Sequence, residues 1–272
     1  MKPIIVQATS GWSRINIRQL YSYREVLFML LRRNLKARYA QTYLGVGWIL
    51  FQPLFTVLLF SVIFGRWMQM SSDGVPYFLF AFTGLICWIF ISSCIQRASG
   101  IMLMDSRLIT KIYFPRLLMP LASLLETLIE TFFLVAVLSL LLLFNPTLIS
   151  WKMTLFPLWI VPLCLLGLGM GSLFSSLGVY YRDAVALLPF FLQTWMYCSP
   201  IVYSTSAVPE KWISLYRLNP MAGILDAMRW SFLNGSNFPT TSFLTACCVA
   251  LFIGFAGVYI FCRLERNFAD VL

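Results

Sequence analysis

The sequence predicts an all-α integral membrane protein with six transmembrane helices. Of its 272 residues, 60% are hydrophobic and only 11% are Asp, Glu, Lys or Arg, whereas soluble globular domains contain about 25% charged residues. The apolar residues are also grouped into runs of the ~20 residues that a helix needs to cross a bilayer. This composition excludes a soluble enzyme, a nucleic-acid-binding module and a disordered protein.

Six apolar runs are long enough to span, and together they cover close to half of the chain. They are Leu44–Phe64, Tyr77–Ile95, Leu117–Phe144, Leu155–Val179, Ala184–Val202 and Phe243–Phe261. The fifth run differs because Pro189 and Pro200 interrupt it and Gln193 is polar. Backbone groups freed by proline must be satisfied inside a protein rather than by lipid, so we expect this run to face other helices or a cavity.

The positions of Lys and Arg orient the spans. If the N-terminus is cytoplasmic, 15 of these 20 residues lie in inner segments and five in outer loops. Cytoplasmic loops carry the excess of positive charge, so both termini are predicted to be cytoplasmic. The chain is then one transmembrane domain (1–272), with an interfacial segment (1–43), a six-span region (44–262) and a tail (263–272). The basic excess follows from this topology, and no nucleic-acid partner is expected.

A basic amphipathic helix is predicted before the first span, within Tyr21–Tyr43. Apolar residues at positions 26, 30, 31, 35 and 39 lie on one helical face. The cationic residues beside that face are Arg32, Arg33, Lys36 and Arg38. Such a helix lies in the plane of the anionic cytoplasmic leaflet. It is interpreted either as an anchor for the first span or as part of a cytoplasmic gate for a lipid-linked substrate. Residues 1–25 contain no apolar core, so no cleavable signal peptide is expected.

The segment Gln96–Arg116, between spans two and three, is too long for a tight turn and too polar to insert. Its charged residues are Arg97, Asp105, Arg107, Lys111 and Arg116. Pro115 can end a short helix or start the next one. We expect a short cytoplasmic helix here, as a solvated connector or as a contact with a partner.

The outer segment Pro200–Ser242 is apolar and predicts a re-entrant or interfacial helix. Pro220 is placed to start a helix after Asn219 as its N-cap, and Gly235 is placed to end it. At about 14 residues, this helix is too short to cross a bilayer.

Ionisable residues inside apolar helices are functional candidates. Glu126 and Glu130 lie one turn apart in the third span. They could serve acid–base chemistry or a proton relay, or they could face a neighbouring helix and bond to Ser, Thr or Arg there. Asp226 and Arg229, three residues apart in the outer helix, are placed to pair on its wetter face.

The chain lacks the usual signatures of catalysis. It contains no GxxxxGK[ST], no HExxH and no His, so neither a nucleotide site nor a metal site is expected. Gly167, Gly169 and Gly171 follow no strand and form no phosphate loop, but the pair Gly167/Gly171 permits close helix packing. Movement of a substrate across the membrane, with energy from another protein, is favoured over chemistry.

Aromatic residues make up 17% of the chain. Those of interest are Trp48, Phe51 and Phe55, on one face of the first span, and Phe191, Trp195 and Tyr197 in the fifth. Flat rings supply large apolar area with few rotatable bonds and so bind sugar rings well. These residues are interpreted as the lining of a conduit for a polymer, or else as ordinary lipid-facing and packing residues.

Six short motifs follow one another along the chain. They are residues 33–48 (RNLKARYAQTYLGVGW) with Gln52-Pro53-Leu54, residues 111–116 (KIYFPR), Tyr181-Arg182-Asp183, residues 199–203 (SPIVY), Asn219-Pro220-Met221 and residues 265–270 (ERNFAD). Each motif alone is weak, but six in register are specific. Their order resembles that in the permease subunits of bacterial ABC exporters for polysaccharides and polyol phosphates.

The resemblance implies a homodimer in the bacterial inner membrane, with two copies of a separate ATP-binding subunit beneath it. ATP and Mg²⁺ would bind to that subunit, so this chain would need no cofactor and hold no catalytic residue. The implied substrate is a polyprenyl-linked glycan, such as an O-antigen, a capsule polysaccharide or a teichoic acid. It would pass through a channel between the two copies, lined by the first and fifth spans.

The same resemblance assigns roles to the residues described above. The channel would be lined by Trp48, Phe51, Phe55, Phe191, Trp195 and Tyr197. Docking on the ATP-binding subunit would use Asp105, Arg107, Lys111, Tyr113 and Arg116. The entrance for the lipid carrier would be bordered by Arg32, Arg33, Lys36 and Arg38, and an outer gate would contain Asn219 and Pro220.

Two other functions remain open at this point. A membrane-embedded transferase acting on lipid-linked sugars would depend on an interfacial carboxylate. An ATP-independent carrier would use Glu126 and Glu130 as proton sites.

Overall fold

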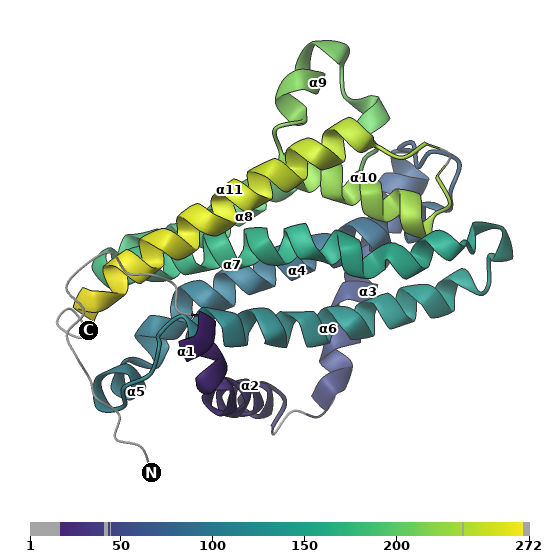
Figure 1. Cartoon of the computed structure of the whole chain (residues 1–272). Coiled ribbons are helices and arrows are strands. Elements are labelled where there is room, and N and C mark those ends of the chain that lie inside the picture. The colour runs from purple at the N-terminus through teal and green to yellow at the C-terminus, as the bar shows by residue number, and fades with distance from the viewer. Residues whose placement is uncertain (1–16, 41–42, 44, 236, 269–272) are drawn as a thin grey trace.

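The computed structural model describes residues 17–40, 43, 45–235 and 237–268, and all regular structure in this part of the chain is helical. Four long helices form a bundle, with α11 crossing the others obliquely (Figure 1). They are α4 (Tyr77–Met104), α6 (Leu118–Leu142), α7 (Phe156–Tyr180) and α11 (Thr240–Leu264). α4 is the central helix, since 78% of its most apolar stretch is buried and it contacts α3, α6, α7, α8 and α10.

Five helical stretches in the described residues are long and apolar enough to cross a membrane. They are Trp48–Trp67, Tyr77–Met104, Leu118–Leu142, Trp151–Tyr180 and Thr240–Leu264. These stretches correspond to predicted spans one, two, three, four and six. The first is α3 (Trp48–Phe60), continued by the π-helical turn Ser61–Trp67.

The predicted fifth span is shorter than expected. It corresponds to α8 (Arg182–Tyr197), which has 16 residues and ends before Pro200. Pro189 lies inside this helix without ending it. At 1.5 Å per residue, α8 is about 24 Å long, less than the ~30 Å thickness of the hydrocarbon core.

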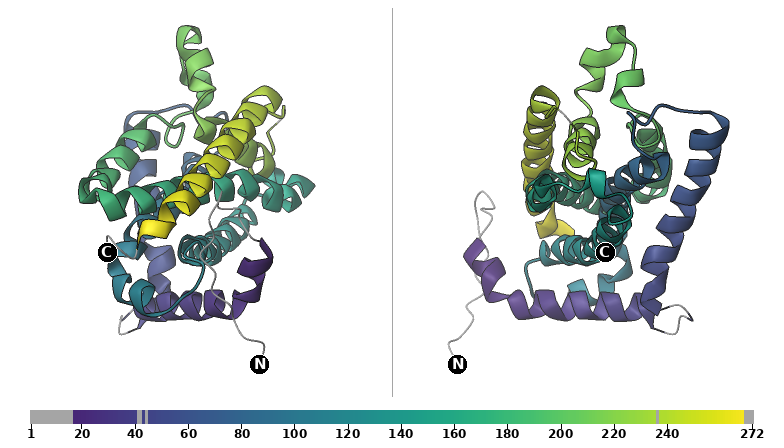
Figure 2. Two further views of the ribbon diagram at one scale, coloured as in Figure 1. Left: turned by 60° about the vertical axis from the view of Figure 1, so that its left-hand side comes forward. Right: turned by 90° about the vertical axis from the view of Figure 1, so that its right-hand side faces the viewer.

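The N-terminal helices form an arm outside the bundle. α1 (Ile17–Ser22) is followed by α2 (Arg24–Tyr39), which lies across the bundle, and by α3. In the right-hand view of Figure 2, α2 and α3 make an L that borders two sides of the bundle. α2 contacts α6, whereas α3 contacts α4 and α6 and is buried over only 11% of its most apolar stretch.

The helix predicted within Tyr21–Tyr43 is therefore α2, but part of its apolar face has a partner in the protein. Leu30 and Leu31 are buried, whereas the apolar side chains of Phe28 and Met29 are exposed. Residues 1–16, 41, 42 and 44 of the predicted N-terminal region lie outside the described residues.

The segments that connect the long helices lie at the two ends of the bundle. The short helix α5 (Ser106–Lys111) projects at the end where α11 finishes, on the left of Figure 1. The connection between α6 and α7 lies at the opposite end. α10 (Pro220–Phe232) contacts α11, and α9 (Glu210–Tyr216) projects away from the bundle.

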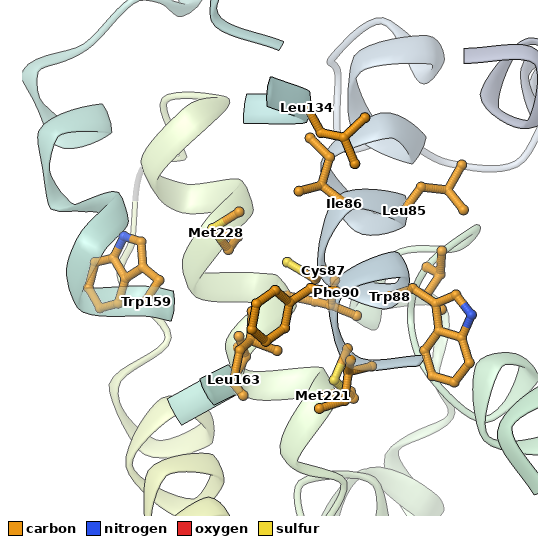
Figure 3. Close-up of a cluster of buried hydrophobic side chains, with 14 of the residues drawn as sticks. Leu85, Ile86, Cys87, Trp88, Phe90, Leu134, Trp159, Leu163, Met221 and Met228 are labelled. Carbon is orange, nitrogen blue, oxygen red and sulfur yellow. The ribbon is translucent and has the colours of Figure 1, made fainter. Parts of the chain in front are cut away.

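The core of the bundle is a cluster of buried apolar side chains. Figure 3 shows part of it, where Leu85, Ile86, Trp88 and Phe90 of α4 meet Leu134 of α6, Trp159 and Leu163 of α7, and Met221 and Met228 of α10. α10 is buried along most of its length. The short outer helix predicted to be re-entrant or interfacial is thus a core element of the fold.

Glycines on opposite faces of α7 allow its neighbours to approach closely. Gly167 and Gly171 face α4, and a Cβ at Gly171 would lie 2.7 Å from the Cβ of Ala98. Gly169 faces α11, and a Cβ there would lie 2.4 Å from the carbonyl oxygen of Ile253. The close packing predicted for Gly167 and Gly171 is confirmed, and Gly169 does the same on the other side.

Gly169→Val is expected to force α7 and α11 apart, because the new side chain would meet backbone atoms that cannot rotate away. We expect a loss of about 1–3 kcal/mol in the free energy of unfolding, as is typical of overpacking, measured as a lower unfolding temperature in detergent. Gly100→Ala is the control, since a Cβ there meets only the sulfur of Met104 at 4.0 Å. Unchanged stability of Gly169→Val would contradict the close contact.

Candidate functional site

Four charged side chains meet between α2, α4 and α6. The Nη2 atom of Arg38 lies 3.2 Å from Oε1 of Glu126, and its Nη1 lies 3.5 Å from Oε1 of Glu130. Arg97 reaches the same carboxylates, with Nη1 3.7 Å from Oε1 of Glu126 and Nη2 paired with Oε2 of Glu130. The side chains of Glu126 and Glu130 are only 3% and 10% exposed. The two positive charges balance the two buried negative charges, which is the condition for ions to persist in an apolar bundle.

Neutral hydrogen-bonding groups also contact this ionic cluster at Glu130 and Arg97. The hydroxyl of Tyr39 donates to Oε1 of Glu130 at 2.5 Å, and Nη1 of Arg97 donates to the hydroxyl of Thr127 at 3.3 Å. Burial raises the pKa of Tyr39, and the hydrogen bond to Glu130 and the charge of that residue raise it further. Tyr39 therefore stays protonated as a donor. The structure agrees with the interpretation in which the two carboxylates face a neighbouring helix and bond to Arg.

Arg97 is the member of the cluster that sequence reasoning missed. The prediction ended the second span at Ile95 and placed Arg97 in a cytoplasmic segment, but α4 continues to Met104. Because the helix continues, Arg97 faces α6 instead of solvent. The signal in the sequence was the pair of carboxylates in the third span, which required compensating cations in the apolar bundle.

The cationic residues predicted to border a lipid entrance are divided between two environments. The side chains of Arg32 and Lys36 are exposed, and Arg32 lines a shallow groove on the outer surface of α2 with Phe28 and Met29. Arg33 forms an ion pair with Asp105, and Arg38 belongs to the ionic cluster. Two of the four cations thus attach α2 to the rest of the chain.

The predicted coupling residues are divided in the same way. Lys111 and Tyr113 are exposed beside α5. Asp105 pairs with Arg33, and Arg116 donates to the carbonyl oxygen of Glu265. The side chain of Arg107 lies outside the described part of the structure.

A second cluster of buried apolar side chains joins the parts of the chain at this end of the bundle. It includes Leu30 of α2, Ile109 of α5, Leu118 of α6 and Phe268 of the C-terminal segment. The guanidinium of Arg116 lies 5.8 Å from the centroid of the Phe268 ring. The helix α2, the predicted coupling segment and the C-terminal segment are therefore packed as one unit.

In α3, the aromatic residues predicted to line a channel are exposed. The ring centroids of Trp48 and Phe51 are 5.5 Å apart, and those of Phe51 and Phe55 are 6.1 Å apart, with the latter two rings stacked. All three side chains are exposed, so the predicted aromatic face is present on one side of the helix.

The predicted channel residues of α8 differ from one another in burial. Phe191 and Tyr197 are exposed, but Trp195 is half-buried. The rings of Trp195 and Trp88 meet edge to face at 5.8 Å, and Trp195 Nε1 donates to Asn219 Oδ1 at 3.0 Å. Trp195 is therefore held against α4 and against the start of α10.

The predicted outer gate residue Asn219 connects α8 to α10. Its Oδ1 accepts from the backbone N–H of Met221 at 3.1 Å, which makes Asn219 the N-cap of α10. Its Nδ2 donates to the carbonyl oxygen of Cys198 and to the hydroxyl of Ser199, both at 3.0 Å. Pro220 is buried as the first residue of the helix, as predicted.

Asp226 and Arg229 bond to other groups rather than to each other, contrary to the predicted pairing. Thr205 donates to Oδ1 of Asp226 at 2.8 Å. Arg229 is buried, with Cζ 3.6 Å from the centroid of the Phe80 ring and Nη2 donating to the carbonyl oxygen of Ile201 at 2.9 Å. The reason is that α10 is a core helix, so Arg229 faces α4 rather than a wet surface. Burial lowers the pKa of Arg229 to about 10, which leaves it charged at neutral pH.

Comparison with known proteins identifies the class of this protein. The model of the family described as "ABC-2 type transporter" matches residues 25–233, which include all of the sites above except the C-terminal segment. The chain therefore belongs to the ABC-2 type transporter family, and the predicted family resemblance is confirmed.

Relatives of similar length have named transport roles. The chain is 28% identical over 257 residues to the O-antigen export system permease protein RfbA of Klebsiella pneumoniae, covering 91% of this chain and 95% of the relative. It is 23% identical to the protein of the same name from Myxococcus xanthus, with 93% and 98% covered. It is 25% identical to the polysialic acid transport protein KpsM of Escherichia coli, with 85% and 90% covered.

Asn219→Ala is expected to loosen the start of α10 and the end of α8 together. The change removes an N-cap, typically worth about 1 kcal/mol, and leaves Nε1 of Trp195 without its acceptor. We expect a lower unfolding temperature and a shift in Trp fluorescence. Asn219→Asp keeps an acceptor for both donors and is expected to lose less, so equal losses in the two variants would contradict this arrangement.

Proposed function

We propose that this chain is the membrane subunit of an ABC exporter that moves a polyprenyl-linked polysaccharide, such as an O-antigen, out of the cytoplasm. The observation that carries the proposal is membership of the ABC-2 type transporter family, together with relatives that match over most of their length. Those relatives are named for export of O-antigen and transport of polysialic acid, and both of these are surface glycans. The chain itself is expected to be a permease rather than an enzyme.

The chain would act as a homodimer in the bacterial inner membrane, with both termini in the cytoplasm. The open aromatic face of α3 supports a second copy, because a span buried over only 11% of its most apolar stretch has surface to share. The excess of Lys and Arg in the inner segments supports the orientation. α8 would complete six spans together with the turn that follows it, since its apolar residues continue to Val202.

The glycan would pass along the aromatic faces of α3 and α8. Phe51 and Phe55 offer stacked rings, and Phe191 and Tyr197 are exposed on α8. Rings of this kind bind many sugars weakly, which suits a polymer that must slide. Trp195 would position the outer gate through Asn219 rather than line the path.

Two copies of an ATP-binding subunit would supply the energy and hold the ATP and Mg²⁺. They would dock on the exposed surface formed by Lys111, Ile112 and Tyr113 next to α5, where a cation adjoins two large apolar side chains. Asp105 and Arg116 would transmit movement into this chain, because both are bonded to other parts of it.

The double substitution Phe51→Ala/Phe55→Ala is expected to reduce export. Losing two ring contacts of about 0.5–1.5 kcal/mol each predicts a decrease of roughly tenfold in the surface glycan made by cells that depend on this chain. Phe252→Ala/Phe255→Ala in α11 is the matched control, because these side chains are at least as exposed but lie on another helix. Equal effects of the two pairs would contradict the proposed path.

The substitution Lys111→Glu/Tyr113→Ala is expected to weaken binding of the ATP-binding subunit. The change reverses one exposed charge and removes one exposed ring without disturbing an internal contact of the described residues. Copurification from membranes measures the effect, and Lys211→Glu in α9, exposed on the outer side, is the control.

Glycan transfer by the purified chain alone, without ATP, would instead support a membrane-embedded transferase.

A further inference from the structure

We propose that Glu126 and Glu130 are positioning residues for α2. With Arg97 they form an anionic seat on the bundle, and this seat binds Arg38 and holds α2 against α6.

The seat is built from parts that belong to the bundle. Glu126 and Glu130 lie one turn apart on α6, and Arg97 projects from α4, which packs against α6. Two carboxylates and one guanidinium leave a net charge of −1 in a largely buried place. A buried charge of this kind needs a partner. Arg38, supplied by α2, brings the total to zero.

The other contacts of α2 with the bundle are the hydrogen bond from Tyr39 to Glu130 and apolar packing, in which Val26 and Leu27 are partly buried. Only Leu30 and Leu31 of its 16 residues are buried. In its second ionic contact, Arg33 with Asp105, the carboxylate is 21% exposed, against 3% and 10% for Glu126 and Glu130. The two arginines are similarly exposed, at 42% for Arg33 and 39% for Arg38. Exposed ion pairs contribute little to stability and are screened by salt. The contact of Arg38 with two buried carboxylates is therefore the ionic contact that contributes most to the position of α2.

The consequence for transport rests on the proposed function. If α2 borders the entrance for a lipid-linked substrate, the seat sets the position of that border relative to α4 and α6. Leaving the seat would free the Arg38 guanidinium and expose an uncompensated negative charge, so α2 is expected to have a defined seated position rather than a range of positions.

Hydrogen exchange of the backbone amides of α2 tests the proposal on the whole chain in lipid nanodiscs. Arg38→Gln is expected to speed exchange in residues 24–39 by on the order of tenfold or more. It is also expected to lower the unfolding temperature, because the net charge of −1 on Glu126, Glu130 and Arg97 would then be buried without a partner. Arg38→Gln/Glu126→Gln removes one charge of each sign. We expect this double variant to recover the unfolding temperature while α2 still exchanges fast.

Arg33→Gln is the matched control, because it removes the other ionic contact of the same helix. It is expected to change the exchange of α2 much less than Arg38→Gln does, and Arg38→Lys is expected to restore part of the protection. Wild-type protection of α2 in Arg38→Gln/Glu126→Gln would overturn the proposal, since the apolar contacts of α2 and the hydrogen bond of Tyr39 would then suffice. Equal release of α2 by Arg33→Gln would also overturn it.

Export by cells carrying the double variant separates this proposal from the proposed function. A several-fold loss of surface glycan, with the ATP-binding subunit still copurifying, is expected if α2 borders the entrance. If α2 is released but export is unchanged, the seat stands and the role of α2 at an entrance fails.

Discussion

Cancellation of buried charge is the constraint on which the arrangement of this protein depends. Two carboxylates one turn apart in α6 could not remain ionised among apolar helices without cations beside them. Arg97 supplies one from the neighbouring bundle helix, and Arg38 supplies the other from α2, which lies outside the bundle. The need for neutrality therefore links the N-terminal arm to the bundle. We expect the position of the arm to respond to anything that competes for Arg38.

The rest of the molecule supplies a stiff frame for this link. Gly169 lets α7 approach the backbone of α11, while Gly171 lets it approach Ala98 of α4. Three long helices are therefore packed too closely for a larger side chain at either glycine. α10 is buried against this frame and carries Asn219, which bonds to α8. The frame contrasts with α3, whose exposed aromatic face has no partner within the described residues. Movement in this family member is thus expected in α2, α3 and α8 rather than in the frame.

At the end of the bundle where α11 finishes, one small hydrophobic cluster connects the surface proposed for the ATP-binding subunit with the helix proposed at the entrance. Ile109 of α5 and Leu30 of α2 share it, and Phe268 of the C-terminal segment closes it. The ion pair between Asp105, just before α5, and Arg33 of α2 is a second connection between the same two helices. A displacement of α5 would therefore reach α2 directly. Arg116, which the family resemblance assigned to docking, donates to the carbonyl oxygen of Glu265 and lies over the ring of Phe268.

Hydropathy alone determined that the chain is a membrane protein and located five of its long helices, because a run of apolar residues needs no partner to be recognised. Local rules also located the cap at Asn219 and the start of α10 at Pro220. The tertiary structure decided which charges meet, since Arg38, Arg97 and Glu130 are far apart in the chain and are joined only by packing. It also decided that Arg229 faces Phe80 rather than Asp226, because the wet or dry side of a short helix is set by its neighbours and not by its own residues.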